Sequence, residues 1–354
     1  MEKVADFEPT EEQFGVLWKY LKNPDITGIN YNGKQLWITD LKKGRYEAEE
    51  ELTEKFLSQF TNTIANCVNK QFNAKNPNLE ADTRELRISI LHEAVAKTGL
   101  SISIRKSPPM VRNTIDRMIE SGYCSEEMVH FLINCIRAKL TFVFGGKPEV
   151  GKTECMKFLM QFIPENERVI TIEDSRELHY GEINPGADCV ELQIGENFDY
   201  RSAIKASLRQ DADWLVLSEA RSSEVTALLE SWSTGICGLT TIHLDDLRKL
   251  PDRIENMMEN REDARRIENR IYSDVGVGIL IRMKKDGARG IERYIDQICL
   301  YCRENGKNRI CFVLEDRDRV CRTLPEETMQ KFKRAGIKDP FYCENVEDYK
   351  SWKR

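Results

Sequence analysis

The chain has 354 residues, 40% hydrophobic and 32% charged, and its 53 basic and 59 acidic side chains give a net charge of −6. This length suits two domains, and the acidic balance argues against a protein that coats duplex nucleic acid, so we expect no stable nucleic-acid binding. No stretch approaches the roughly eighteen consecutive apolar residues of a membrane-spanning helix, and the acidic start MEKVADFEPTEEQF lacks the pattern of a signal peptide. A cytoplasmic location is therefore expected.

The first hundred residues predict a small α+β domain. A helix is expected over residues 10–22, and two short β-rich runs then flank Asn32-Gly33, a hairpin signal because both turn positions favour positive φ. Apolar residues at helical spacing predict a long helix from Glu47 to about Gln71. The runs ELRISILHEAVA and LSISIRK alternate as strands do.

A domain boundary is expected at Pro108-Pro109, because proline continues neither a strand nor a helix. After it, helices alternate with the fully apolar strands LTFVFGG, RVITIED, DWLVLSEA and GLTTIHL, a pattern typical of a parallel sheet covered on both faces. The helices are placed at Lys152–Phe162, Tyr200–Leu208 and Ser223–Ser233. We therefore expect a first domain at 1–107, a linker at 108–113, an α/β domain at 114–315 and a tail of uncertain structure at 316–354.

The eleven cysteines are scattered and are interpreted as reduced thiols. Cys299, Cys302, Cys311 and Cys321 could be proposed as a zinc site, but the last two lack the spacing of a second close pair. The interpretation we prefer is two strands, QICLYC and RICFVLE, joined by a turn. Cys299 and Cys302 would then point to opposite faces.

A phosphate-binding loop stands between a predicted strand and a predicted helix. The strand LTFVF is followed by G-x-x-x-x-G-K-[ST], whose residues are Gly146, Lys147, Pro148, Glu149, Val150, Gly151, Lys152 and Thr153. Backbone N–H groups of such a loop and the helix N-terminus hold the β and γ phosphates of ATP, the lysine adds a charge and the hydroxyl reaches Mg²⁺. The motif predicts an ATP and Mg²⁺ site.

Acidic side chains follow two other apolar strands, where ligands bind in α/β sheets. Glu173 and Asp174 end VITIED, and Glu219 ends WLVLSE; either strand end offers a carboxylate that could orient water at the γ-phosphate. His243 ends GLTTIH and is placed as a γ-phosphate sensor or as a coupling group. Arg221 is interpreted either as a surface cation or as a phosphate contact.

The motifs together resemble those of the type II/type IV secretion ATPase superfamily, with the type IV secretion, conjugation and tight-adherence pilus motors as the most similar branch. GKPEVGKT matches the P-loop, TIEDSREL the Asp box, LRQDADWLVLSEAR the Walker B region and STGICGLTTIH the His box. ITGINYNG and LSISIRK resemble strands of the family's N-terminal domain, and DGARGIERYIDQI resembles its late strand pair. The resemblance implies an α/β P-loop (RecA-like) ATPase domain with a smaller N-terminal α+β domain.

The resemblance also implies roles. Glu219 would polarise the attacking water, Glu173 and Asp174 would organise Mg²⁺ and water, His243 would link the γ-phosphate to the ring, and Arg105 would reach the nucleotide. The protein would be a homo-oligomer, expected to be a hexamer, that works with inner-membrane secretion or pilus proteins on the cytoplasmic face of the membrane.

The chain departs from the family pattern at several positions. Lys147 and Glu149 stand where the P-loop has glycine or small residues, Ile236 replaces a histidine, and Ser218 replaces the glycine before Glu219. These departures leave room for a nucleotide-binding scaffold with weak or no hydrolysis. A DNA-processing ring ATPase is a further alternative, opposed by the net acidity.

Overall fold

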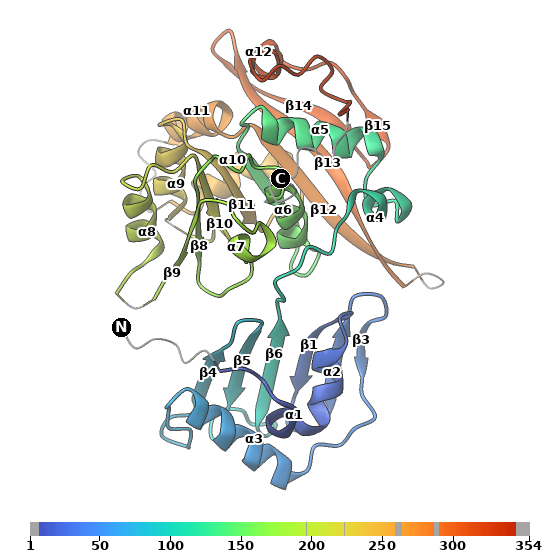
Figure 1. The fold of residues 1–354 in the computed structure, drawn as a ribbon, viewed down its shortest axis with the longest axis vertical. Helices are drawn as coiled ribbons and strands as arrows, with labels where there is room; N and C mark the ends of the chain where they lie inside the picture. Colours follow the sequence, from blue (N-terminus) through green and yellow to red (C-terminus); the bar gives the residue numbers. More distant parts are fainter. Residues whose placement is uncertain (1–6, 196, 223, 259–263, 287–289, 345–354) are drawn as a thin grey trace. The chain divides into compact units, whose positions relative to one another are not determined.

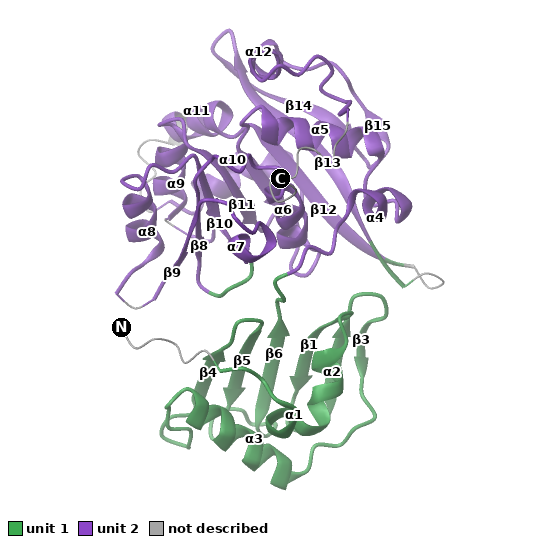
Figure 2. Cartoon of the chain, in the orientation of Figure 1, with its two compact units in different colours: residues 1–109, 175–177, 285–292 green, residues 110–174, 178–284, 293–354 purple. Residues whose placement is uncertain are grey.

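A computed structural model describes residues 7–195, 197–222, 224–258, 264–286 and 290–344. Parts of several predicted features lie outside these residues: the start of the acidic N-terminus, residue 223 of one expected helix, three residues of DGARGIERYIDQI and the last ten residues of the tail. The chain forms two compact units (Figure 2). Unit 1 comprises Met1–Pro109, Ser175–Glu177 and Lys285–Glu292, and unit 2 comprises Met110–Asp174, Leu178–Lys284 and Arg293–Arg354.

Unit 1 is built on a six-stranded antiparallel sheet in the order β3-β2-β1-β6-β5-β4 (Figure 1). Alternate residues of these strands are buried, so one face supplies a core that helices cover. The strands are β1 (Ile26–Tyr31), β2 (Leu36–Asp40), β3 (Gly44–Glu47), β4 (Asn78–Asp82), β5 (Leu86–Leu91) and β6 (Ser101–Lys106). The helices are α1 (Glu11–Phe14), η1 (Gly15–Leu17), α2 (Trp18–Lys22) and α3 (Glu54–Cys67).

Two helix predictions in unit 1 differ from the structure. The helix expected over 10–22 is divided, because Gly15 takes a positive φ of +46° between α1 and the following turns. The helix expected from Glu47 starts at Glu54, where the Thr53 side chain accepts a hydrogen bond from the backbone N–H of Phe56 (3.2 Å). Glu47 and the three residues before it instead pair with β2 as β3, an edge strand that has too few apolar residues to be predicted from the sequence.

Unit 2 is built on a nine-stranded sheet in the order β15-β14-β13-β12-β7-β11-β10-β8-β9. The strands from β12 to β9 in this order are parallel, whereas β13, β14 and β15 pair antiparallel. Their bounds are β7 (Phe142–Gly145), β8 (Val169–Glu173), β9 (Cys189–Gln193), β10 (Trp214–Leu217), β11 (Cys237–Ile242), β12 (Val277–Asp286), β13 (Gly290–Glu304), β14 (Lys307–Glu315) and β15 (Arg319–Val320).

Helices cover both faces of this sheet (Figure 1). One face packs against α4 (Ile115–Glu120), α5 (Glu126–Arg137), α6 (Lys152–Met160), α7 (Tyr180–Ile183) and α12 (Glu326–Arg334). The other packs against α8 (Tyr200–Ser207), α9 (Glu224–Trp232), η2 (Leu247–Lys249), α10 (Leu250–Glu255) and α11 (Ala264–Asp274). The central strands are buried on both faces, as their continuous apolar runs indicated. The expected fold class is confirmed: an α/β P-loop domain with a smaller N-terminal α+β unit.

The cysteines of the C-x-x-C run lie on opposite faces of β13. Cys299 belongs to the core on the α9 face, whereas Cys302 has its Sγ 3.9 Å from that of Cys311, which packs on the α5 face. Among the residues that the structure describes, no group of three or more His, Cys, Asp or Glu side chains is arranged to hold a metal ion. The arrangement is that of the two strands joined by a turn.

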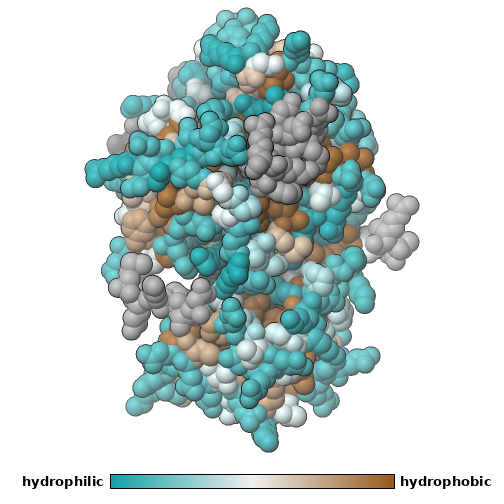
Figure 3. Space-filling view, in the orientation of Figure 1, coloured by the Kyte–Doolittle hydropathy of each residue, from teal (hydrophilic) through white to brown (hydrophobic). Residues whose placement is uncertain are grey.

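The described surface is largely polar on the face drawn in Figure 3, where apolar side chains form only small patches. Within the described part of the chain, no helix is both long and apolar enough to cross a bilayer.

The tail contributes to the core of unit 2 through α12 and the segment after it. The ring of Phe131 in α5 stacks on that of Phe341, with centroids 5.0 Å apart. The ring centroid of Phe332 in α12 lies 6.1 Å from that of Phe131. Asn134 of α5 is fully buried, and its Nδ2 donates to the carbonyl oxygens of Asp339, Pro340 and Tyr342 at 3.0–3.3 Å. One side chain therefore fastens the tail to α5.

Asn134→Ala should lower the free energy of unfolding by about 1–3 kcal/mol, because it leaves the buried carbonyl of Pro340 and two partly buried carbonyls without their donor. Urea unfolding followed by far-UV circular dichroism measures this difference. Asn66→Ala, at an exposed position of α3, is the matched control and should change stability by less than about 0.5 kcal/mol. An equal effect of both substitutions would contradict the anchoring role of Asn134.

Candidate nucleotide site

The site lies where four neighbouring parallel strands end. β7, β11, β10 and β8 are adjacent in this order, with Gly145 opposite Ile242, and with Leu217 opposite both Thr240 and Ile172. Because these strands run in the same direction, their carboxyl ends meet at one edge of the sheet. The residues that follow them, which include the P-loop, His243, Glu219 and Asp174, are thereby brought together.

The P-loop connects β7 to α6 in a backbone path that two glycines make possible. Gly146 has φ +150° and Gly151 has φ +95°. A Cβ on Gly146 would lie 2.6 Å from the carbonyl oxygen of Ile281 in β12, so no larger residue fits there. Gly151 is the N-cap of α6, which places the helix N-terminus at the end of the loop, the arrangement that binds phosphate groups.

The other loop residues divide into exposed and buried positions. Lys147, Pro148 and Glu149 are exposed, and Glu149 takes a left-handed φ of +65°. Val150 is buried in the core, and Thr153 is half-buried as the second residue of α6. The Glu149 side chain is thus on the solvent side of the loop.

Lys152 is held in place by the loop that it follows. Its Nζ donates to the carbonyl oxygens of Gly146 (3.2 Å) and Lys147 (3.1 Å), and it lies 3.2 Å from Nδ1 of His243. The side chain is buried. The ammonium group therefore bridges the P-loop and the end of β11.

A chain of polar contacts continues from His243 across the strand ends. Nε2 of His243 lies 2.7 Å from Oε1 of Glu219. The other carboxylate oxygen of Glu219 accepts a hydrogen bond from Nε of Arg221 (2.9 Å) and lies 2.8 Å from its Nη2. Nη1 of Arg221 in turn pairs with Oδ2 of Asp174 at 2.9 Å. Five of the predicted site residues thus form one connected chain from Lys152 to Asp174.

The charge state of Arg221 follows from this setting. Partial burial disfavours the cation, but the carboxylates of Glu219 and Asp174 outweigh burial and raise its pKa. Arg221 is therefore a permanent cation between two carboxylates.

Glu224, at the start of α9, binds the backbone of the turn that carries Arg221. Its carboxylate accepts from the backbone N–H groups of Arg221 (2.6 Å) and Ser222 (2.9 Å) and from the Ser222 hydroxyl (2.5 Å). Burial raises its pKa, but these hydrogen bonds outweigh burial, so the pKa of Glu224 is lowered. A buried, ionised carboxylate therefore fixes the turn that carries Arg221.

Glu173 is oriented differently from Asp174. It is only 4% exposed, and its Oε1 accepts from the backbone N–H of Leu178 (2.9 Å). The carboxylate thus stabilises the loop of the Asp box, whereas the side chain of Asp174 contacts Arg221 at the strand edge.

The departures at 218 and 236 take buried or half-buried positions. Ser218 is buried behind Glu219, and its carbonyl oxygen accepts from the Thr241 hydroxyl (2.8 Å), which joins β10 to β11. Ile236 packs against the core on the α9 face.

Arg105 lies on β6 of unit 1, where its Nη2 pairs with Oε1 of Glu177 at 3.2 Å. Its expected contact with nucleotide stays a prediction.

Three residues close to the site were missed from the sequence. Besides Glu224, Tyr200 lies near Asp174, and burial together with that charge raises the pKa of Tyr200 to about 12. The side chain of Arg293 on β13 lies beside the P-loop, with its Cδ 3.6 Å from where a Cβ on Gly151 would stand. Glu224 had a signal, an acid at the start of a predicted helix, but the other two depend on contacts between distant strands and helices.

The family description "Type II/IV secretion system protein" matches residues 70–344. An uncharacterized protein of Bacillus anthracis is 28% identical over 247 residues, which cover 69% of this chain but only 55% of that protein. The probable conjugal transfer protein TrbB of Sinorhizobium fredii is 25% identical over 240 residues, covering 65% of this chain and 70% of that protein. The fold matches that of the Legionella pneumophila ATPase DotB with a TM-score of 0.59, at 15% identity over 95% of this chain and 91% of that chain. This chain belongs to the type II/IV secretion system protein family.

Proposed function

We propose that the protein hydrolyses Mg-ATP as a homo-oligomer, expected to be a hexamer, and that hydrolysis powers a secretion, conjugation or pilus-assembly machine. The observation that carries the proposal is the unbroken chain of contacts from Lys152 through His243, Glu219 and Arg221 to Asp174. A phosphate loop alone explains binding only. A carboxylate joined to that loop by a histidine supplies the second group that hydrolysis requires.

The residues of the site divide the work between binding and reaction. Residues 146–153 offer backbone N–H groups to the phosphates, and Lys152 offers a cation that exchanges its loop carbonyl partners for phosphate oxygens. Glu219 orients the attacking water and accepts hydrogen bonds from it. Because Arg221 binds one oxygen of Glu219 and Nε2 of His243 lies 2.7 Å from the other, the carboxylate has a defined position before the nucleotide arrives.

A magnesium ion fits the donors at this edge. Mg²⁺ prefers oxygen ligands and is commonly held by one or two carboxylates together with substrate phosphates and water. The Thr153 hydroxyl at the start of α6 and the Asp174 carboxylate after β8 are such oxygens. When bound, the ion would neutralise phosphate charge, and we propose Thr153 and Asp174 as the residues that hold it. Glu173 would act by holding the Asp-box loop.

The partners follow from the family and stay proposals. TrbB is named a probable conjugal transfer protein, and DotB is named an ATPase. On the basis of its family, we propose that the protein acts at the cytoplasmic face of the membrane, with inner-membrane secretion or pilus proteins as partners.

The test is phosphate release by the purified full chain with ATP and Mg²⁺. We expect steady turnover that EDTA abolishes and excess Mg²⁺ restores. Light scattering in the same buffers should show a larger oligomer with a non-hydrolysable ATP analogue than without it. ATP binding without phosphate release would instead favour the nucleotide-binding scaffold, and a monomer under every nucleotide condition would contradict the motor.

A further inference from the structure

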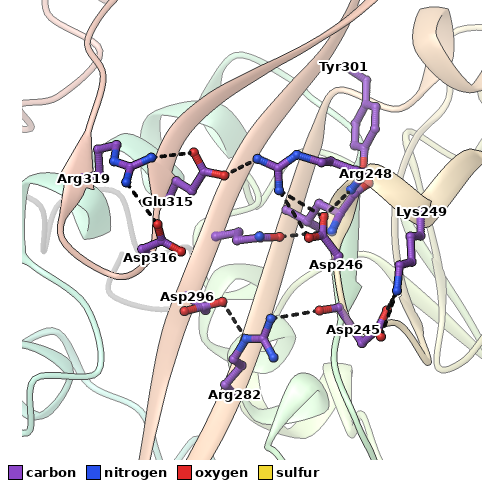
Figure 4. Close-up of polar contacts among 12 residues, drawn as sticks. Asp245, Asp246, Arg248, Lys249, Arg282, Asp296, Tyr301, Glu315, Asp316 and Arg319 are labelled. Carbon is purple, nitrogen blue, oxygen red and sulfur yellow. Dashed lines mark hydrogen bonds and ion pairs between the residues drawn. The ribbon is translucent and has the colours of Figure 1, made fainter.

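The segment that follows His243 is fastened to the neighbouring strands by polar contacts (Figure 4). β11 ends at Ile242, and the chain then passes through His243 to the short helix η2, which starts at Leu247. Side chains from β12, β13 and β14 bind this segment at several points. The position of His243 therefore depends on strands other than its own.

The contact nearest to His243 is made by Arg282 of β12. Its Nη2 donates to the carbonyl oxygen of Asp245 (2.9 Å), two residues after His243. Its Nε pairs with Oδ2 of Asp296 on β13 at 2.5 Å. Figure 4 shows the Arg282 guanidinium lying between these two partners. Because Asp296 binds the guanidinium from the opposite side, Arg282 is itself held in place. It can therefore fix the position of the Asp245 carbonyl group.

Deeper contacts hold the next part of the segment. The backbone N–H of Leu247 donates to Oε1 of Gln297 (3.0 Å), and the Tyr301 hydroxyl donates to the Leu247 carbonyl (2.6 Å). Gln297 and Tyr301 are buried, whereas Arg282 is partly exposed. Gln297 and Tyr301 thus belong to the folded core, and the loss of Arg282 alone leaves them intact.

β12 also supports the P-loop. Leu280 pairs with Gly145, and the carbonyl oxygen of the next residue, Ile281, lies against Gly146. Arg282 follows directly. One strand therefore touches the phosphate loop with Ile281 and the His243 segment with Arg282.

We propose that Arg282, held by Asp296, is a positioning residue that sets His243 against Glu219 and Lys152. The inference rests on the proposed hydrolysis of ATP and adds a residue pair outside the four sequence motifs. Arg282 acts through the backbone at Asp245 and touches no reacting atom. Its loss lets His243 leave the 2.7 Å contact with Glu219 and weakens the orientation of that carboxylate.

The first test compares the ATPase kinetics of the full chain and of Arg282→Gln. We expect kcat to fall roughly ten-fold, because misplacing a group in the site is costly, while the KM for ATP changes less than about two-fold. Asp296→Asn should reproduce the loss. Lys249→Ala is the matched control: among the described residues, the ammonium of Lys249 pairs with the exposed carboxylate of Asp245 and with no other acid, so turnover should stay unchanged.

A second measurement separates positioning from general loss of structure. If Arg282 acts through His243, the double variant Arg282→Gln/His243→Ala should be no slower than His243→Ala alone. Multiplied effects, or full activity in Arg282→Gln, would overturn the inference. Should Arg282→Gln fail to fold, Asp296→Asn takes its place in the same cycle. No phosphate release by the unmodified chain would contradict the proposed function itself, which this design distinguishes from a failure of the Arg282 inference.

Discussion

Replacing Lys152 with alanine is expected to reduce ATP turnover by at least roughly a hundred-fold, the effect of removing one preorganised donor from a reacting centre. Lys152 is the buried cation of the P-loop, and its Nζ already lies within 3.2 Å of two loop carbonyls and of His243. The substitution removes the charge that we propose meets the β and γ phosphates. It also removes the contact that joins the loop to His243. Phosphate release and binding of a fluorescent ATP analogue measure the two consequences separately.

The control for this variant is Lys205→Ala, at an exposed position of α8, which should release phosphate at the normal rate. Circular dichroism should show that both variants are folded. Undiminished turnover in Lys152→Ala would remove the basis for the P-loop assignment.

Glu219→Gln is expected to bind ATP and to hydrolyse it roughly a hundred- to ten-thousand-fold more slowly, the range for losing a group that assists proton transfer. The amide keeps the shape of the side chain but loses the negative charge that pairs with Arg221 and lies beside His243. A residue that acts mainly in the transition state lowers kcat with little change in ATP affinity. The variant should therefore retain bound ATP during gel filtration.

Glu173→Gln tests the rival carboxylate and should behave differently. Glu173 holds the Asp-box loop through the backbone N–H of Leu178, and Asp174 follows it in that loop. We expect its loss to shift the Mg²⁺ concentration needed for half-maximal turnover. Glu230→Gln, exposed on α9, serves as control for both. Normal turnover in Glu219→Gln together with tight, unreactive ATP binding in Glu173→Gln would reverse the two assignments.

Local patterns were sufficient to predict the central strands and the motifs that follow them. The strands β7, β8, β10 and β11 are continuous apolar runs, and parallel pairing then requires that their carboxyl ends meet. The edge strands β3 and β4 escaped notice, because each is short and offers few buried side chains.

Pairing between distant residues could not be predicted. Nothing adjacent to Arg282 in the sequence indicates that it binds the backbone at Asp245, which depends on β12 and β11 lying on either side of β7. The contrast between Glu173 and Asp174 is similar: two neighbouring acids at one strand end differ only because the backbone directs one inward and the other toward Arg221.

The unequal burial of the P-loop separates positions where packing restricts the side chain from positions where it does not. Gly146 lies against the carbonyl oxygen of Ile281 and Val150 is buried in the core, so packing restricts which residues can stand at these two positions. Residues 147–149 of the loop are exposed, so packing does not restrict which side chains stand there. Lys147 and Glu149, the two charged departures, stand at these exposed positions, where a charged side chain does not disturb the packing of the loop. Charge at the exposed positions of the loop can thus change while the packing that fixes its backbone stays the same.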